Sequence, residues 1–151
     1  MYSGINDIKF IALRFFTVYG PKQRPDLAIF RFFDRIINNK KIQVYGKGDT
    51  FRDYTYIDDI VAGIINSINI NSNFEIINLG NNQPIKLLDL ISMIESITNK
   101  KAKIEFMPLP KGDVPATYAD ITKANELINF SPKIKLENGL KDFYNWYLSN
   151  R

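Results

Sequence analysis

Short, nearly continuous hydrophobic runs alternate along this chain with longer segments in which hydrophobic residues recur every three or four positions. The runs at 9–16 (KFIALRFF) and 73–80 (NFEIINLG) are apolar and rich in β-forming residues, which is typical of strands covered on both faces in a parallel sheet. Helical spacing marks the segments 26–39, 60–68 and 87–98. Strands that alternate with helices predict an α/β fold.

Less regular segments complete the prediction. They are a short strand at 42–46, an extended piece at 51–56, a strand at 103–109, and helices at about 121–128 and 136–149 with Pro132 between them. Asp26 is well placed to begin the first helix, and Asp58 and Asp59 lie where a helix N-terminus favours negative charge. Strands that are buried on both faces belong to a parallel sheet with helices on each side, and this chain supplies few other strands to build one. We therefore expect the latter part of a larger sheet.

Composition narrows the possible functions. The 151 residues are 45% hydrophobic and 24% charged, which is enough for one globular domain with a core. The chain has no cysteine and no histidine, which excludes disulfides, thiolate or imidazole metal sites and histidine-activated nucleophiles. Its net charge of +4 is scattered, which does not favour nucleic acid as a partner. No apolar run could span a membrane and the N-terminus lacks a secretory signal, so we expect a cytoplasmic protein.

Arginines in predicted loops are the first candidates for ligand binding. Arg24 and Arg52 lie outside the predicted helices, and Arg14 ends a strand at the edge where open α/β sheets bind ligands. A guanidinium group can hold a carboxylate or phosphate through two parallel hydrogen bonds, which suits an acidic, phosphorylated ligand. For any one arginine alone, a surface position or an ion pair with a neighbouring aspartate is the more frequent outcome.

Six segments, in order and over nearly the whole chain, carry a family resemblance. They are LRFFTVYGP (13–21), RPD (24–26), VYGKGDTFRDYTYIDDIV (44–61), INLGNNQPIKLLDLI (77–91), PLPKGDVPATYAD (108–120) and GLKDFYNWY (139–147). With them the chain resembles the C-terminal half of the extended short-chain dehydrogenase/reductases, within these the nucleotide-sugar epimerases and dehydratases, and among those the UDP-glucuronate 4-epimerases.

The resemblance implies a fold with two parts. The last strands of a doubly wound Rossmann-type parallel sheet are expected near 9–15 and 74–79. A small α/β substrate-binding region is expected near 17–56 and 84–151. The N-terminal dinucleotide-binding half of the family is expected to be absent from this chain.

The resemblance also assigns nucleotide-binding roles to three residues. Arg52 is similar to the family's arginine that grips the nucleotide diphosphate, which fits the chemistry of a fixed guanidinium. Tyr45 occupies the place of an aromatic residue near the uracil ring, although packing in the core is an equal alternative. Asp113 resembles the acid that accepts hydrogen bonds from the ribose hydroxyls. Many relatives carry arginine or glutamine three residues before this acid, where this chain has Pro110.

Two further residues bear on the sugar. In the uronate-specific branch of the family, residues that match Thr17 and Arg24 lie beside the sugar carboxylate, and a galactose-type enzyme more typically has asparagine at the place of Thr17. An alternative is that Arg24 only fixes its loop. The resemblance therefore implies a UDP-sugar ligand and favours UDP-glucuronate.

The family's reaction depends on NAD, which takes a hydride from C4 of the sugar and returns it to the other face of the ketone intermediate. It requires a glycine-rich dinucleotide fingerprint and a tyrosine followed four residues later by lysine. This sequence has neither, and Gly46 and Gly48 precede a strand instead of a helix. We therefore assign no catalytic or cofactor-binding residue here, and expect NAD to be bound mainly by the other half.

Two hypotheses follow for function. The first is the UDP-sugar-binding half of an NAD-dependent 4-epimerase that interconverts UDP-glucuronate and UDP-galacturonate and is inactive alone. The second is a non-catalytic nucleotide-sugar-binding or partner subunit, and a fragment of a dehydratase or decarboxylase is a further alternative. An open sheet edge beside apolar faces predicts a partner, either an N-terminal half or a second copy of the chain. The resemblance implies a role in polysaccharide synthesis.

Overall fold

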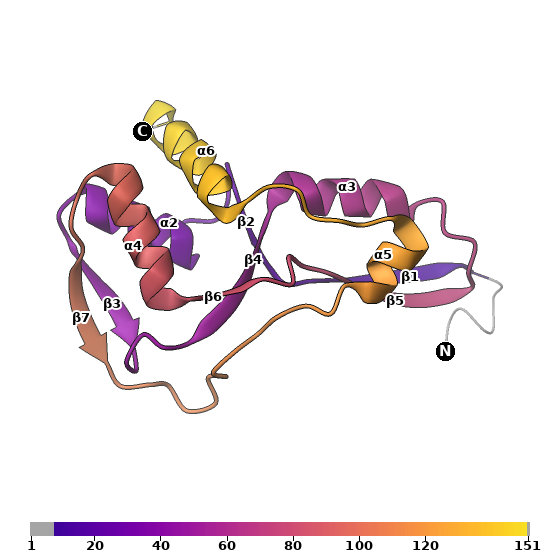
Figure 1. The fold of residues 1–151 in the computed structure, drawn as a ribbon, viewed down its shortest axis with the longest axis horizontal. Helices are drawn as coiled ribbons and strands as arrows, with labels where there is room; N and C mark the ends of the chain where they lie inside the picture. Colours follow the sequence, from indigo (N-terminus) through magenta and orange to yellow (C-terminus); the bar gives the residue numbers. More distant parts are fainter. Residues whose placement is uncertain (1–7, 151) are drawn as a thin grey trace.

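The computed structural model describes residues 8–150, which form an elongated molecule containing three small sheets (Figure 1). At one end, β1 (Phe10–Phe15) and β5 (Phe74–Leu79) form a parallel pair in which Leu13 lies opposite Ile77. Helices α3 (Ile57–Ser67) and α5 (Thr122–Ile128) pack beside this pair. These elements make the parallel α/β part of the fold.

The middle of the molecule is a three-stranded sheet centred on β4 (Phe51–Tyr56). β2 (Thr17–Tyr19) pairs with β4 in parallel, and β6 (Pro84–Lys86) pairs with it in antiparallel orientation. β4 crosses the middle of the molecule (Figure 1), where it contacts α3 of one end and α6 (Leu136–Ser149) of the other. The predicted extended piece at 51–56 is therefore the central strand of the structure.

The other end contains a second parallel pair, β3 (Lys41–Tyr45) with β7 (Lys103–Met107). Three helices pack near it, namely α2 (Ala28–Ile37), α4 (Leu87–Thr98) and α6 (Leu136–Ser149). α2 contacts both β3 and α4, and α4 contacts α6. This end of the molecule lies farthest from β1 and β5 (Figure 1).

Two hydrophobic clusters correspond to the two ends. The larger joins α2, α4 and α6 to β3 and to the tyrosines of the central sheet, with Phe33, Ile42, Ile94 and Phe143 among its fully buried members. The smaller joins the β1–β5 pair to α3 and α5, and its buried members are Ile60, Ile77, Leu79, Ala124, Ile128 and Phe130. The regularly spaced hydrophobic side chains of each helix thus face one cluster or the other.

Several predicted boundaries change in the structure. The helix predicted at 26–39 begins at Ala28, and Asp26 does not cap it because the N-cap residue is Leu27. Asp58 and Asp59 lie in the first turn of α3, as predicted, and the Asp59 carboxylate also accepts backbone hydrogen bonds of 3.0 Å from the segment before α6. β2 and β6 were not predicted, because strands of three residues leave too little periodicity to detect.

Within residues 8–150, β1 and β5 are covered on one face only, which agrees with the expectation that they belong to a larger sheet. Phe10 and Phe74 are each 52% exposed and stack on one another with ring centroids 5.9 Å apart, and Ile76 is 44% exposed. α3 and α5 both pack against the opposite face, through residues such as Ile77 and Leu79. One apolar face of this pair is therefore left open. Residues 1–7, where the sequence predicts no secretory signal, lie outside the described part.

A buried carboxylate connects the central strand to the two neighbouring segments. Asp53 on β4 is fully buried, and its carboxylate oxygens accept backbone hydrogen bonds from Asn81 (3.0 Å), Asn82 (2.9 Å) and Ala119 (2.9 Å). Asn81 and Asn82 follow β5, and Ala119 lies in the loop that precedes α5. The three hydrogen bonds offset the cost of burying the charge.

We expect Asp53→Asn to destabilise the fold, because it places amide hydrogens against backbone donors. A hydrogen bond to a charged group contributes about 1.5–3 kcal/mol, so the free energy of unfolding should fall by about 3 kcal/mol in urea denaturation followed by circular dichroism. Asp49→Asn makes the same charge change at an exposed position and is the control. Equal losses in both variants would contradict a specific role for Asp53.

Candidate functional site

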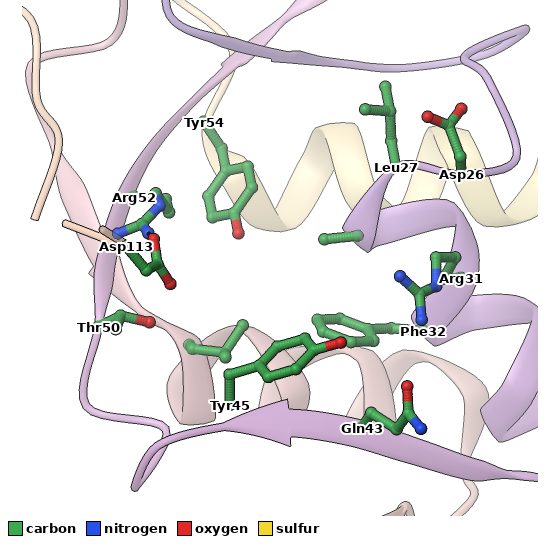
Figure 2. A pocket seen from close by; sticks show the side chains of 12 residues that line it. Asp26, Leu27, Arg31, Phe32, Gln43, Tyr45, Thr50, Arg52, Tyr54 and Asp113 are labelled. Atoms are coloured by element: carbon green, nitrogen blue, oxygen red, sulfur yellow. Dashed lines mark hydrogen bonds and ion pairs between the residues drawn. The ribbon is translucent and has the colours of Figure 1, made fainter. Parts of the chain in front are cut away.

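A pocket of about 280 Å³ lies between α2, β3, β4 and the loop that contains Asp113 (Figure 2). Its lining includes aromatic, aliphatic and charged side chains. They are Asp26, Leu27, Ala28, Arg31, Phe32, Gln43, Tyr45, Thr50, Arg52, Tyr54, Leu87 and Asp113. The pocket thus combines segments that are far apart in the sequence.

An ion pair closes one end of this pocket. Arg52 Nη2 lies 2.6 Å from Asp113 Oδ1, and Arg52 Nη1 donates to the carbonyl oxygen of Phe51 at 2.8 Å. The side chains of Arg52 and Asp113 are 23% and 31% exposed, so both remain reachable from solvent. The arginine is therefore held in one orientation by two partners.

Strand β4 also positions the loop that contains Asp113. The backbone N–H of Phe51 donates to Pro115 O at 2.8 Å, and Thr117 N donates to Phe51 O at 3.1 Å. These two hydrogen bonds attach the loop to the residue that directly precedes Arg52. Asp113 and Arg52 consequently lie together although 61 positions separate them in the sequence.

Arg31 lies at the other end of the pocket (Figure 2). No ion pair or hydrogen bond of its guanidinium group is found among residues 8–150, whereas Arg24 and Arg52 each have an aspartate partner. Arg31 was missed in the sequence analysis. It follows Leu27 by four positions on a predicted helix, so helical spacing could have placed the two side chains on one face.

Two tyrosines face the interior of the pocket from different strands (Figure 2). Tyr45 on β3 is 39% exposed and lines the pocket, so it does not serve core packing. Tyr54 on β4 is buried, and this burial raises its pKa to about 12 against the opposing effect of the Arg52 charge. Tyr54 is therefore a neutral phenol at physiological pH, able to donate a hydrogen bond but unsuited to act as a base.

Of the five residues selected from the sequence, Tyr45, Arg52 and Asp113 line this pocket, and Thr17 and Arg24 do not. Thr17 lies on β2 opposite Tyr54 in the strand register. Arg24 pairs with Asp26 at 3.1 Å, and its side chain is 75% exposed. It borders a neighbouring hollow of about 470 Å³. The ligand contacts of all five residues stay predictions.

The pocket brings charged and aromatic side chains together. Two arginines and two aspartates line it together with the aromatic rings of Phe32, Tyr45 and Tyr54. Within residues 8–150, no group of three or more acidic side chains could hold a metal ion. In the same part of the chain, no helix has the length and apolar character needed to cross a membrane. Such a pocket can hold an anion next to a planar ring.

Comparison with known proteins identifies the family. A sequence profile described as the NAD dependent epimerase/dehydratase family matches residues 2–80, which is more than half of the chain. The chain belongs to this epimerase/dehydratase family. An uncharacterized protein of Methanocaldococcus jannaschii is 48% identical over 151 residues, and a UDP-glucuronate 4-epimerase of Thermodesulfobacterium geofontis is 44% identical over 150 residues.

Solved structures of this epimerase/dehydratase family have the same fold. UDP-glucuronic acid 4-epimerase from Bacillus cereus, in complex with UDP-glucuronic acid and NAD, matches with a TM-score of 0.93 and 37% identity. The match covers 99% of the present chain and 48% of the Bacillus chain. The two relatives above are covered to 46% each, so the chain spans about half the length of the proteins it matches.

The sequence motifs that bind NAD in this family are not found in this chain. The sequence has no G-x-G-x-x-G fingerprint and no tyrosine followed four residues later by lysine. Gly46 and Gly48, the glycine pair nearest to that pattern, lie in the turn between β3 and β4 and not at the start of a helix. Binding of NAD in this family therefore depends mainly on segments other than those described here.

The raised pKa of Tyr54 makes a prediction for alkaline stability. The folded chain keeps the phenol proton up to about pH 12, whereas an unfolded chain releases it near its ordinary value of 10. The contribution of Tyr54 is therefore full below pH 10 and decreases as pH rises toward 12. We expect a loss of about 1 kcal/mol in the free energy of unfolding at pH 11. Tyr54→Phe should lack this part of the decline.

Urea denaturation of the native chain and of Tyr54→Phe at pH 8, 10 and 11 checks this expectation. The dependence of the free energy of unfolding on pH should differ between the two proteins only above pH 10. Identical pH dependence in both proteins would show that Tyr54 is not the protected phenol.

Proposed function

We propose that the pocket binds the uridine diphosphate part of a UDP-sugar, and that the chain is the UDP-sugar-binding half of an NAD-dependent 4-epimerase. The observation that carries this proposal is the pairing of Arg52 with Asp113 at 2.6 Å in a pocket lined by Tyr45. A diphosphate requires a cation, ribose requires a hydrogen-bond acceptor, and a pyrimidine ring requires an aromatic or apolar surface. These three groups lie within one pocket.

In this proposal each group of the ligand has a partner. Arg52 holds the diphosphate, Asp113 accepts hydrogen bonds from the ribose hydroxyls, and Tyr45 lies along the uracil ring. Arg31 supplies a second cation from α2. Pro110, which stands where many relatives have a polar side chain, offers no side-chain donor.

UDP-glucuronate is the proposed sugar nucleotide, with Thr17 and Arg24 beside the sugar carboxylate. Arg24 is paired with Asp26, which itself lines the pocket, so the guanidinium group lies next to the α2 end of the site. Relatives named UDP-glucuronate 4-epimerases from Thermodesulfobacterium geofontis and Arabidopsis thaliana support this choice. The proposed reaction is the interconversion of UDP-glucuronate and UDP-galacturonate.

The proposed reaction needs a dinucleotide-binding half in addition to the residues described here. NAD would supply hydride transfer at C4 of the sugar, and this chain would orient the sugar nucleotide. Its own residues bind the substrate and none is assigned to proton transfer. We therefore propose that residues 1–151 alone bind the ligand without turning it over.

A second candidate function is a partner subunit that holds a nucleotide sugar without catalysis. The open apolar face with Phe10, Phe74 and Ile76 favours it, because exposed apolar surface of this kind commonly marks an interface. Both candidates expect another polypeptide segment on that face. Turnover of UDP-glucuronate when a dinucleotide-binding half of a relative is added would favour the enzyme, and its absence the partner subunit.

Calorimetric titration with UDP-glucuronate, UDP-glucose and NAD tests the binding role. We expect UDP-glucuronate to bind best and NAD not to bind. Arg52→Gln should weaken binding of UDP by about 1.5–3 kcal/mol, because a hydrogen bond between charged groups is lost. Arg35→Gln, on the same protein but outside the pocket, is the matched control. Unchanged UDP affinity in Arg52→Gln would refute the assignment.

The preference for an acidic sugar depends on Arg24 in this proposal. Arg24→Ala removes one partly screened charge interaction, so the ratio of affinities for UDP-glucuronate and UDP-glucose should fall by up to about fivefold. Competition titrations with the two ligands measure this ratio. An unchanged ratio would leave Arg24 as a residue that only fixes its loop.

A further inference from the structure

One edge of the β3–β7 pair is unpaired. Within residues 8–150, β7 pairs with β3 alone, and it lies on the outer side of that strand (Figure 1). Gly46 N donates to Met107 O at 2.9 Å, so the backbone polar groups of Met107 point toward β3. These groups alternate in direction along a strand, so the N–H and C=O groups of Ile104 and Phe106 point to the free edge. Two residues of β7 can therefore pair with another strand.

The side chains at this edge are apolar on the face that packs toward the helices. Ile104 is 38% exposed and Phe106 is 58% exposed. Their partners on β3, Ile42 and Val44, are fully buried. Ala102 directly precedes β7 and lies on the same face, because side chains alternate along an extended chain. The apolar surface thus continues beyond the part that the helices cover.

The opposite face of β7 carries one charge of each sign. Glu105 Oε1 lies 3.2 Å from Lys41 Nζ, and the Glu105 side chain is 43% exposed, so its second oxygen can accept a hydrogen bond from another molecule. No ion pair of the Lys103 ammonium group is found among residues 8–150. The free edge thus offers a cation and an anion two positions apart.

Both faces match those of a second copy in one register. An antiparallel arrangement about a two-fold axis at Ile104 places Lys103 opposite Glu105 of the second copy. It also places Ala102 opposite Phe106 of the second copy, and Ile104 opposite itself. An axis at Lys103 or at Glu105 would place like charges opposite each other, and an axis between two residues would place apolar side chains opposite charged ones. The axis at Ile104 is the one that pairs opposite charges and keeps apolar side chains together.

Hydrogen bonding favours the same register. The two Ile104 residues would exchange their N–H and C=O groups, and each Phe106 N–H would reach Ala102 O of the other copy. The Ala102 N–H already donates to Glu95 Oε1 at 2.7 Å, and the pairing does not require it. The free backbone groups of the edge therefore find partners without the loss of an existing hydrogen bond.

We propose that β7 pairs in antiparallel orientation with β7 of a second copy of this chain, about a two-fold axis at Ile104, and joins two β3–β7 pairs into one sheet. The inference goes beyond the proposed function, because it requires no ligand and concerns the end of the molecule that lies farthest from the open face of β1 and β5 (Figure 1). A strand of five residues buries less surface than an interface of standard size, so the dimer is weak and depends on protein concentration.

Charge reversal tests the register. Lys103→Glu leaves two acidic side chains opposite each other across the axis, and Glu105→Lys leaves two basic ones. Each variant alone should dissociate about tenfold more readily than the native chain in sedimentation velocity over a range of concentrations. An equimolar mixture of the two variants should associate again, because opposite charges then face each other. Lys111→Glu, the same change in an exposed loop, is the control.

An introduced cysteine gives a second readout, since the chain has none of its own. In the proposed dimer the two Ile104 Cα atoms lie about 5.5 Å apart, which is within the range of a disulfide, whereas the two Phe106 Cα atoms lie about 13 Å apart. Ile104→Cys should therefore form a disulfide-linked dimer on oxidation. Phe106→Cys, at the more exposed position, should not.

The inference is overturned if the native chain stays monomeric at every concentration. It is also overturned if the mixed variants fail to associate although the circular dichroism of each matches that of the native chain. Association that Lys103→Glu and Lys111→Glu weaken equally, or that neither weakens, would place the contact elsewhere, as would equal cross-linking of the two cysteine variants. The open face of β1 and β5 would then be the interface to test.

Discussion

The hydrogen bonds of one buried carboxylate join the central strand of this molecule to the end that contains β1 and β5. Asp53 accepts three backbone hydrogen bonds, two from the turn after β5 and one from the loop before α5. They add to the two backbone hydrogen bonds between Phe51 and the loop before α5. Because an unpaired buried charge is costly, the three donors and the carboxylate constrain each other. The position of β4 relative to the turn after β5 and the loop before α5 follows from this constraint.

The pocket depends on the same strand. Side chains alternate across a β-strand, so Arg52 and Tyr54 share the face opposite that of Asp53. Asp53 fixes β4 from one side, while Arg52 and Tyr54 line the pocket on the other. The loop attached to Phe51 then adds Asp113. Of three consecutive residues of β4, Asp53 therefore stabilises the fold, while Arg52 and Tyr54 line the pocket.

Membership in the epimerase/dehydratase family bears on two features of the molecule, its length relative to its relatives and its exposed apolar face. The chain spans about half the length of the relatives it matches, and one apolar face of the β1–β5 pair is open. The absence of a dinucleotide fingerprint from the sequence accords with the proposed function, in which these residues would hold a nucleotide sugar and other segments would hold NAD.

The amino-acid sequence by itself determined the α/β class, most helices and the motif residues Tyr45, Arg52 and Asp113, because periodicity and motifs are local properties of a chain. Tertiary structure alone decided which of these residues meet. The Arg52–Asp113 ion pair joins residues 61 positions apart, and the short strands β2 and β6 exist only through pairing with β4. Long-range pairing also placed Arg31 in the pocket and left Phe10 and Phe74 exposed. Local patterns carry no record of such contacts, because they form only when distant segments pack together.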